Sequence, residues 1–145
     1  MTRRAPALAL CLALVAIVTA AACSDNEMAP SLDVPFSTTD LVPGTGAVAV
    51  TGNSVTVHYT GWLYDPDAAD NKGLQFDSSI GGTPFTLTLG SNQAIDGFDQ
   101  GILGMSVGGT RRIVIPPHLG YGSSPNGPIP GNSTLLFEVT LVSIP

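Results

Sequence analysis

The amino-acid sequence predicts an α+β domain in which a curved antiparallel β-sheet wraps around one short helix. Several separate segments alternate apolar with polar residues, and this period of two is typical of half-buried strands. One segment instead repeats its apolar residues every three or four positions, as an amphipathic helix does. The 17 glycines and 12 prolines indicate many turns between short elements. A curved sheet that covers a single helix is the simplest arrangement that buries both patterns.

Four segments carry the strand pattern, and they are residues 55–60, 85–89, 111–115 and 134–144. The third segment ends at Pro116 and Pro117, because proline has no N–H to donate to a neighbouring strand. In the last segment, alternate positions from Leu135 to Leu141 are apolar, and Leu136 lies on the opposite face. We therefore expect part of that second face to be covered as well.

The helical stripe has spacings of three, four and three residues and consists of Ile95, Phe98, Ile102 and Met105. Asn92 is the expected N-cap, and Gly104 is expected to end the helix. Gly97 and Gly101 lower the intrinsic helix propensity of this segment. We therefore expect the helix to persist only because tertiary packing holds its apolar stripe.

Composition limits the classes of function that the chain can have. Its 145 residues include 5 Lys and Arg against 11 Asp and Glu. Without residues 1–22, it has 3 basic and 11 acidic residues, a formal charge of −8. This charge opposes binding to the phosphates of nucleic acids. The length suits one domain with its own core and is too short for a two-domain nucleotide enzyme.

Residues 1–22 are expected to be a signal peptide. Arg3 and Arg4 supply the positive start, residues 7–18 form an apolar segment of the usual length, and residues 20–22 are small. A transmembrane helix is the alternative interpretation. However, the apolar run is short for a hydrocarbon core of about 30 Å, and no basic residues follow it closely. The sequence therefore predicts export.

Cys23 directly follows these small residues, and this arrangement resembles a bacterial lipoprotein box, in which the cysteine is acylated. Ala20 stands where such boxes usually have leucine, and ordinary cleavage that leaves Cys23 a free thiol is the alternative. We expect residues 23–40 to be a flexible tether and residues 41–145 to be the domain. The protein would then be periplasmic or on the cell surface, anchored to a bacterial membrane by lipid. Cys11 would be removed, so no disulfide is expected.

The common signatures of nucleophilic and metal-dependent catalysis are absent from the sequence. It has no G-x-S-x-G, Walker A or H-E-x-x-H motif, and His58 and His118 are sixty residues apart. The acidic segment 65–71 lacks the glycine and the glutamate of an EF-hand loop, so we interpret it as a solvated hairpin loop and predict no metal site. Hydrolysis by a triad or by zinc is therefore unsupported.

A series of short motifs runs along the chain. They are VHYTGWL at 57–63, FDSS at 76–79, PFxLxLG at 84–90, IxGF at 95–98, GxxxMxVG at 101–108, YG at 121–122, IP at 129–130 and LxFxVxL at 135–141. In this order the motifs resemble those of the FKBP-type peptidyl-prolyl cis-trans isomerases, and the resemblance extends from about residue 43 to the C-terminus. The fold that the resemblance implies, a half-cone antiparallel sheet around one short helix, agrees with the pattern of apolar residues.

The resemblance also implies roles for individual residues. The proline ring of a substrate would enter a pocket with Phe98 as its floor, where the family usually has Trp. The hydroxyl of Tyr121 and the backbone N–H of Ile95 would bond substrate carbonyls, and Asp77 would be a buried acid that bonds Tyr59. Thus Tyr59, Asp77, Phe98 and Tyr121 are the implied catalytic residues, and the implied substrate-binding residues are Phe76, Phe85, Ile95, Ile129 and Phe137.

The activity implied by the resemblance is isomerisation of X–Pro bonds in proline-containing polypeptides, assisting the folding of exported proteins. Such a reaction needs no cofactor. The resemblance also implies that tacrolimus and rapamycin inhibit the protein by binding in the same pocket. We expect the protein to be a monomer. Three departures from the family pattern are Phe98 itself, the lack of a basic residue between Ser79 and Pro84, and a slightly shorter loop at residues 123–131 that contains three prolines. Two alternatives stay open: a peptide-holding module of the same fold with little turnover, and a surface lipoprotein that contacts an envelope or host partner through residues 64–75.

Overall fold

The computed structural model describes residues 33–145, so the predicted signal peptide and Cys23 lie outside the described residues. Its strands are β1 (Ser37–Val42), β2 (Ser54–Tyr64), β3 (Lys72–Ser78), β4 (Phe85–Thr88), β5 (Thr110–Ile115) and β6 (Leu135–Ser143). One α-helix, α1 (Asp96–Ile102), and two short 3-10 helices, η1 (Ala69–Asn71) and η2 (Pro117–Leu119), complete the described part. Within these residues, no helix has the length and apolar character needed to cross a membrane.

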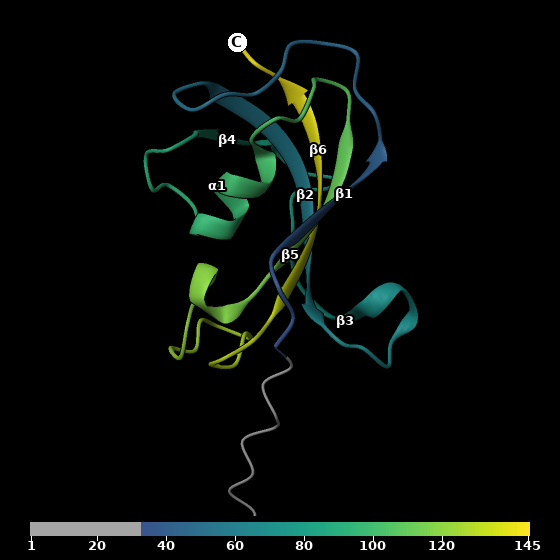
Figure 1. Ribbon diagram of the computed structural model, residues 1–145, viewed down its shortest axis with the longest axis vertical. Helices are drawn as coiled ribbons and strands as arrows, with labels where there is room; N and C mark the ends of the chain where they lie inside the picture. Colours follow the sequence, from purple (N-terminus) through teal and green to yellow (C-terminus); the bar gives the residue numbers. More distant parts are fainter. Residues whose placement is uncertain (1–32) are drawn as a thin grey trace, which may run out of the picture.

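The strands form one antiparallel sheet in the order β1-β5-β6-β2-β3, with α1 against one of its faces (Figure 1). Strand β4 pairs with the first half of β2 and β3 with its second half, so both lie along the same edge of β2. β2 and β6 pair over most of their length at the centre of the sheet. The predicted fold class, a curved antiparallel sheet wrapped around one short helix, is confirmed.

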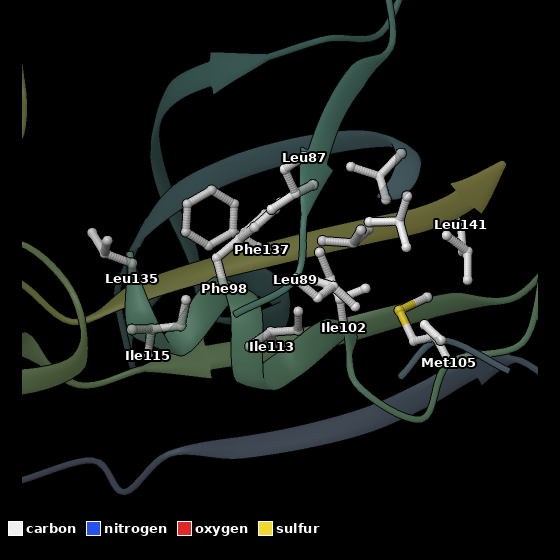
Figure 2. Packing of buried hydrophobic residues seen from close by; sticks show 14 of the residues in the cluster. Leu87, Leu89, Phe98, Ile102, Met105, Ile113, Ile115, Leu135, Phe137 and Leu141 are labelled. Atoms are coloured by element: carbon white, nitrogen blue, oxygen red, sulfur yellow. The ribbon is translucent and has the colours of Figure 1, made fainter. Parts of the chain in front are cut away.

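The core lies between α1 and the face of the sheet that it covers. In Figure 2, Phe98 and Ile102 extend from α1 into a layer of apolar side chains that includes Leu87 of β4 and Phe137 of β6. Ile102 is completely buried, and Met105, which follows the helix, is 2% exposed. The predicted stripe therefore does hold the helix to the sheet. On the other face of β6, Leu136 is also fully buried, as predicted.

The start of the helix differs from the prediction. Ile95, not Asn92, occupies the N-cap position, and no side chain caps the helix. Asn92 instead adopts a left-handed conformation with φ of 57° in the preceding loop. The predicted end is correct, because the last helical residue is Ile102 and Gly104 has a φ of 81°. Asn92 thus forms part of a turn in the loop and does not cap the helix.

The sheet also begins earlier than the sequence suggests. Ser37 to Asp40, which lie within the predicted tether, belong to β1 and pair with β5. All residues of β1 are exposed, so this edge strand has no alternation of apolar and polar residues that could reveal it. Its attachment is partly polar, because Arg111 Nε donates a 2.6 Å hydrogen bond to Asp40 Oδ1. The predicted loop 64–75 is likewise shorter, since β3 begins at Lys72.

Candidate functional site

A pocket of about 150 Å³ opens on the face of the sheet that carries α1. It is lined by Tyr59, Phe76, Asp77, Phe85, Gln93, Ala94, Ile95, Phe98, Tyr121 and Phe137. The pocket lies where the edge of β2 changes partner, since Val57 pairs with Phe85 of β4 and Thr60 pairs with Ser78 of β3. Tyr59 stands between these two positions. The topology therefore brings side chains from distant parts of the sequence around one tyrosine.

Phe98 is the buried centre of the aromatic cluster in this pocket. Only 3% of it is exposed, and its ring centroid lies 5.2 Å from that of Phe137, 5.7 Å from that of Tyr59 and 6.4 Å from that of Phe85. All three contacts are edge-to-face, the arrangement in which the positive edge of one ring meets the negative face of another. The rings therefore hold one another at an angle instead of collapsing into a stack.

One wall of the pocket depends on a glycine in β2. A Cβ built at Gly61 would lie 2.7 Å from Cε1 of Phe137 and 2.7 Å from Cζ of Phe76. These two rings pack edge to face with their centroids 5.5 Å apart. Gly61 thus lets both aromatic rings lie directly on the backbone of β2.

The hydroxyl of Tyr59 is hydrogen-bonded to the carboxylate of Asp77. It donates a 2.6 Å hydrogen bond to Asp77 Oδ2, while Asp77 Oδ1 accepts the N–H of Ser78 at 2.8 Å. The pKa of Tyr59 is raised to about 12. Burial is the largest cause, and the hydrogen bond to Asp77, the charge of Asp77 and the nearby Tyr121 add to it in that order. Tyr59 is therefore neutral near pH 7. Asp77 itself is exposed, not buried as the resemblance implied, because it stands near the end of the edge strand β3.

The two hydrogen-bond donors that the resemblance implies for substrate carbonyls have no protein acceptor within residues 33–145. They are the hydroxyl of Tyr121, whose residue is 38% exposed, and the backbone N–H of Ile95 at the N-cap position of α1. Tyr121 comes from the segment after η2, and Ile95 comes from the loop before α1. Both can therefore donate to a molecule that enters the pocket.

Comparison with known proteins identifies the family to which the chain belongs. The family model described as "FKBP-type peptidyl-prolyl cis-trans isomerase" matches residues 46–142, which is most of the described chain. The chain belongs to this family. The family predicted from the sequence motifs is thereby confirmed.

Similar proteins agree with the assignment of the chain to the FKBP-type isomerases. The chain is 46% identical over 107 residues to an FK506-binding protein of Neisseria meningitidis serogroup B, a match that covers 72% of this chain and 92% of the relative. It is 53% identical over 95 residues to FK506-binding protein 2B of Rhizopus delemar, covering 64% of this chain and only 43% of that longer protein. A crystal structure of AtFKBP13 matches with a TM-score of 0.66 and 35% identity, covering 76% of this chain and 93% of that one.

The structure of this FKBP-type isomerase brings all but one of the candidate catalytic and substrate-binding residues into the pocket. The exception is Ile129, which is 4% exposed, packs in the hydrophobic core and does not line the pocket. Asn126 and Ile129 exchange backbone hydrogen bonds of 2.9 Å in both directions, and this tight turn holds Ile129 in place at the core. A direct contact of Ile129 with substrate is therefore not supported.

Two pocket residues of this FKBP-type isomerase were missed by the sequence analysis. Gln93 and Ala94 line the wall directly before Ile95. Neither residue is part of a recognisable motif, and the loop that carries them has no periodicity. Their proximity to Ile95 in the sequence was the one available signal. Elsewhere in residues 33–145, no group of three His, Cys, Asp or Glu side chains is placed to hold a metal ion.

Proposed function

We propose that this protein catalyses cis–trans isomerisation of X–Pro bonds in exported polypeptides by taking the amide out of water and holding it as it twists. The observation that carries the proposal is an aromatic pocket with Phe98 as its floor and two free donors, Tyr121 and Ile95, beside it. A proline ring is the apolar part of the substrate, and it would fill the space between the rings.

The reaction explains why no nucleophile is needed. The uncatalysed rotation has a barrier of about 18–20 kcal/mol because the planar amide is stabilised by resonance. No covalent bond is made or broken, so the enzyme needs only to stabilise the twisted amide relative to the planar one. The planar amide has the larger dipole, and water therefore stabilises it more than the twisted form. An apolar pocket removes that advantage.

Orientation of the substrate by hydrogen bonds makes a second contribution to lowering the rotational barrier. The hydroxyl of Tyr121 and the N–H of Ile95 would donate to carbonyls of the substrate and hold the geometry in which rotation occurs. A millionfold acceleration needs about 8 kcal/mol, and burial of one proline ring contributes only about 2–3 kcal/mol by area. Desolvation of the amide and orientation by these donors would supply the remainder.

Tyr59 has a different role in this mechanism. Its proton is bonded to Asp77, and its pKa of about 12 keeps it neutral, so we do not assign it proton transfer. Its ring instead lies edge-to-face with Phe85, Phe98 and Phe137 and shapes the pocket wall. Asp77 fixes the orientation of that ring through the shared hydrogen bond.

Several relatives are named FK506-binding proteins. We infer that FK506 (tacrolimus) and rapamycin bind in the same pocket of this protein and compete with peptides. The test is a chymotrypsin-coupled assay with an Ala-Leu-Pro-Phe peptide, in which the protein should accelerate isomerisation and FK506 should abolish the acceleration. Isomerisation at the uncatalysed rate would reject the proposal.

The presence of Phe98 at the floor favours one second candidate, a module that holds proline-containing chains with little turnover. Measuring kcat/KM beside peptide affinity distinguishes the two. Phe98→Trp would raise turnover if the floor limits it. Binding at micromolar peptide without acceleration would favour the holding function.

We also propose that the protein acts outside the cytoplasm on a lipid anchor. The support is in the sequence: the charged and apolar start, the small residues 20–22 and then Cys23. Residues 24–36 would connect the acylated cysteine to β1, which begins at Ser37. Mass spectrometry of the N-terminus of protein from the native membrane is the test. An unmodified Cys23, or an intact residue 1–22 segment, would contradict the anchor.

A further inference from the structure

Gln93 is a polar side chain of the pocket wall whose orientation is set by the backbone. The N–H of Thr88 donates a 2.6 Å hydrogen bond to Oε1 of Gln93. A backbone N–H can only donate, so the atom that faces it must be the carbonyl oxygen of the side-chain amide. The NH₂ group of Gln93 is therefore the free end, and it has no acceptor in the described part of the chain.

The loop that carries Gln93 is held at several other points. Gly90 N–H donates to Oδ2 of the buried Asp99 at 3.1 Å, which ties the end of β4 to α1. The hydroxyl of Ser91 donates to the carbonyl of Thr88 at 2.7 Å. These bonds reduce the freedom of the loop before any ligand arrives. A donor that is already oriented loses less entropy when it binds a partner.

We propose that the NH₂ group of Gln93 donates a hydrogen bond to a backbone carbonyl of the bound polypeptide in the segment that flanks the proline. The inference rests on the proposed function, because it takes the occupant of the pocket to be a peptide. Gln93 lies two residues before Ile95 in the sequence, and both line the pocket. If the N–H of Ile95 binds the substrate beside the proline, the NH₂ group of Gln93 is placed to reach the neighbouring part of the peptide. A backbone carbonyl is present at every position of a peptide, and the contact therefore binds chains irrespective of their flanking side chains.

The kinetic consequence follows from where the contact lies. A flanking carbonyl does not rotate with the X–Pro bond, so the bond to Gln93 stabilises the ground state and the transition state equally. Loss of such uniform binding raises KM and leaves kcat unchanged. We expect an increase in KM of about fivefold to tenfold, the size of one lost hydrogen bond to a neutral group.

The decisive variant is Gln93→Glu. It keeps an oxygen that accepts from Thr88 N–H and replaces the NH₂ donor with a second oxygen. Gln100→Glu is the matched control, because it makes the same change on an exposed residue of α1 that does not line the pocket. Measurements in 0.5 M NaCl screen the added charge. Gln93→Ala removes both the acceptor and the donor.

The readouts are KM and kcat from NMR exchange, the melting temperature, and peptide Kd from NMR titration. We expect Gln93→Glu to raise KM and Kd about fivefold or more, with kcat within twofold of wild type and the melting temperature unchanged, and Gln100→Glu to match wild type. Unchanged KM and Kd in Gln93→Glu would overturn the inference. The inference would also be overturned if KM and Kd rise in Gln93→Ala but not in Gln93→Glu, because Gln93 would then act only by holding the loop. Absence of turnover in wild type would instead reject the proposed function, and Kd would still test the contact.

Discussion

Gly101 of α1 lies directly against Ile113 of β5. A Cβ built at Gly101 would overlap Cδ1 of Ile113 and would lie 2.7 Å from its Cγ2. Gly97, one turn earlier, meets Ile115 in the same way. These two glycines let the helix axis approach the sheet closely, and Phe98 between them is thereby seated at the floor of the pocket with only 3% of it exposed.

Replacing Gly101 with alanine should destabilise the protein although alanine is the better helix former. The helix propensity gain is about 1 kcal/mol, but an overpacked core costs about 1–3 kcal/mol. Ile113 is fully buried, and its branch atoms Cγ2 and Cγ1, at 2.7 and 2.8 Å from the added Cβ, would have to shift as well as its terminal Cδ1. Urea unfolding should show a lower free energy of unfolding for Gly101→Ala. Gln100→Ala, on the exposed side of the helix, should be neutral or slightly stabilising. A Gly101→Ala protein more stable than wild type would contradict this close approach.

The glycines show why the sequence predicted some features and not others. The apolar stripe predicted the helix, but Gly97 and Gly101 could be interpreted only as weak helix formers, since their partners Ile113 and Ile115 are distant in sequence. The pocket rings were found through motifs. Strand β1 has no apolar alternation, and Ile129 is turned into the core by a local pair of backbone bonds that no residue pattern reveals. The close helix–sheet approach, strand β1 and the position of Ile129 all depend on contacts between residues that are distant in sequence or on local backbone geometry, so no residue pattern predicts them.

The raised pKa of Tyr59 predicts a loss of stability at alkaline pH. In the unfolded chain this phenol ionises near pH 10, whereas in the folded protein it ionises at about 12. The stabilising contribution is therefore complete below pH 10 and is lost as the pH rises through 12. Urea unfolding of wild type and Tyr59→Phe at pH 9, 10.5 and 11.5 isolates this residue. The free energy of unfolding of wild type should fall relative to that of the variant, and parallel curves would be inconsistent with the shifted pKa.

Asp77→Asn should lower the pKa of Tyr59 without restoring it to 10. The substitution removes the carboxylate charge and weakens the 2.6 Å bond, but burial, the largest cause of the shift, remains. Ultraviolet titration of the tyrosines, with Tyr59→Phe to identify the signal, measures the change. An unaltered titration of Tyr59 in Asp77→Asn would show that the carboxylate does not control it.

Phe98→Leu should keep the fold and lose much of the activity. Leucine retains an apolar floor but is smaller than phenylalanine, so the cost in stability should be about 1–2 kcal/mol, less than the roughly 3–5 kcal/mol typical of Phe→Ala. It removes the ring that meets Tyr59, Phe85 and Phe137 edge to face, and the pocket should then hold the proline less firmly. We expect kcat/KM to fall about tenfold, a loss of about 1.4 kcal/mol. Leu87→Met, in the core outside the pocket, is a suitable control, and equal activity losses in both variants would point to a general effect of the core.

Catalysis in the aromatic pocket is tested most directly by NMR exchange spectroscopy of an Ala-Leu-Pro-Phe peptide with a catalytic amount of the protein. We expect cis–trans exchange far faster than the uncatalysed timescale of tens to hundreds of seconds. FK506 should abolish the exchange and shift the resonances of Tyr59 and Phe98. Exchange at the uncatalysed rate, with these pocket resonances unperturbed by peptide, would show that the pocket does not catalyse the isomerisation.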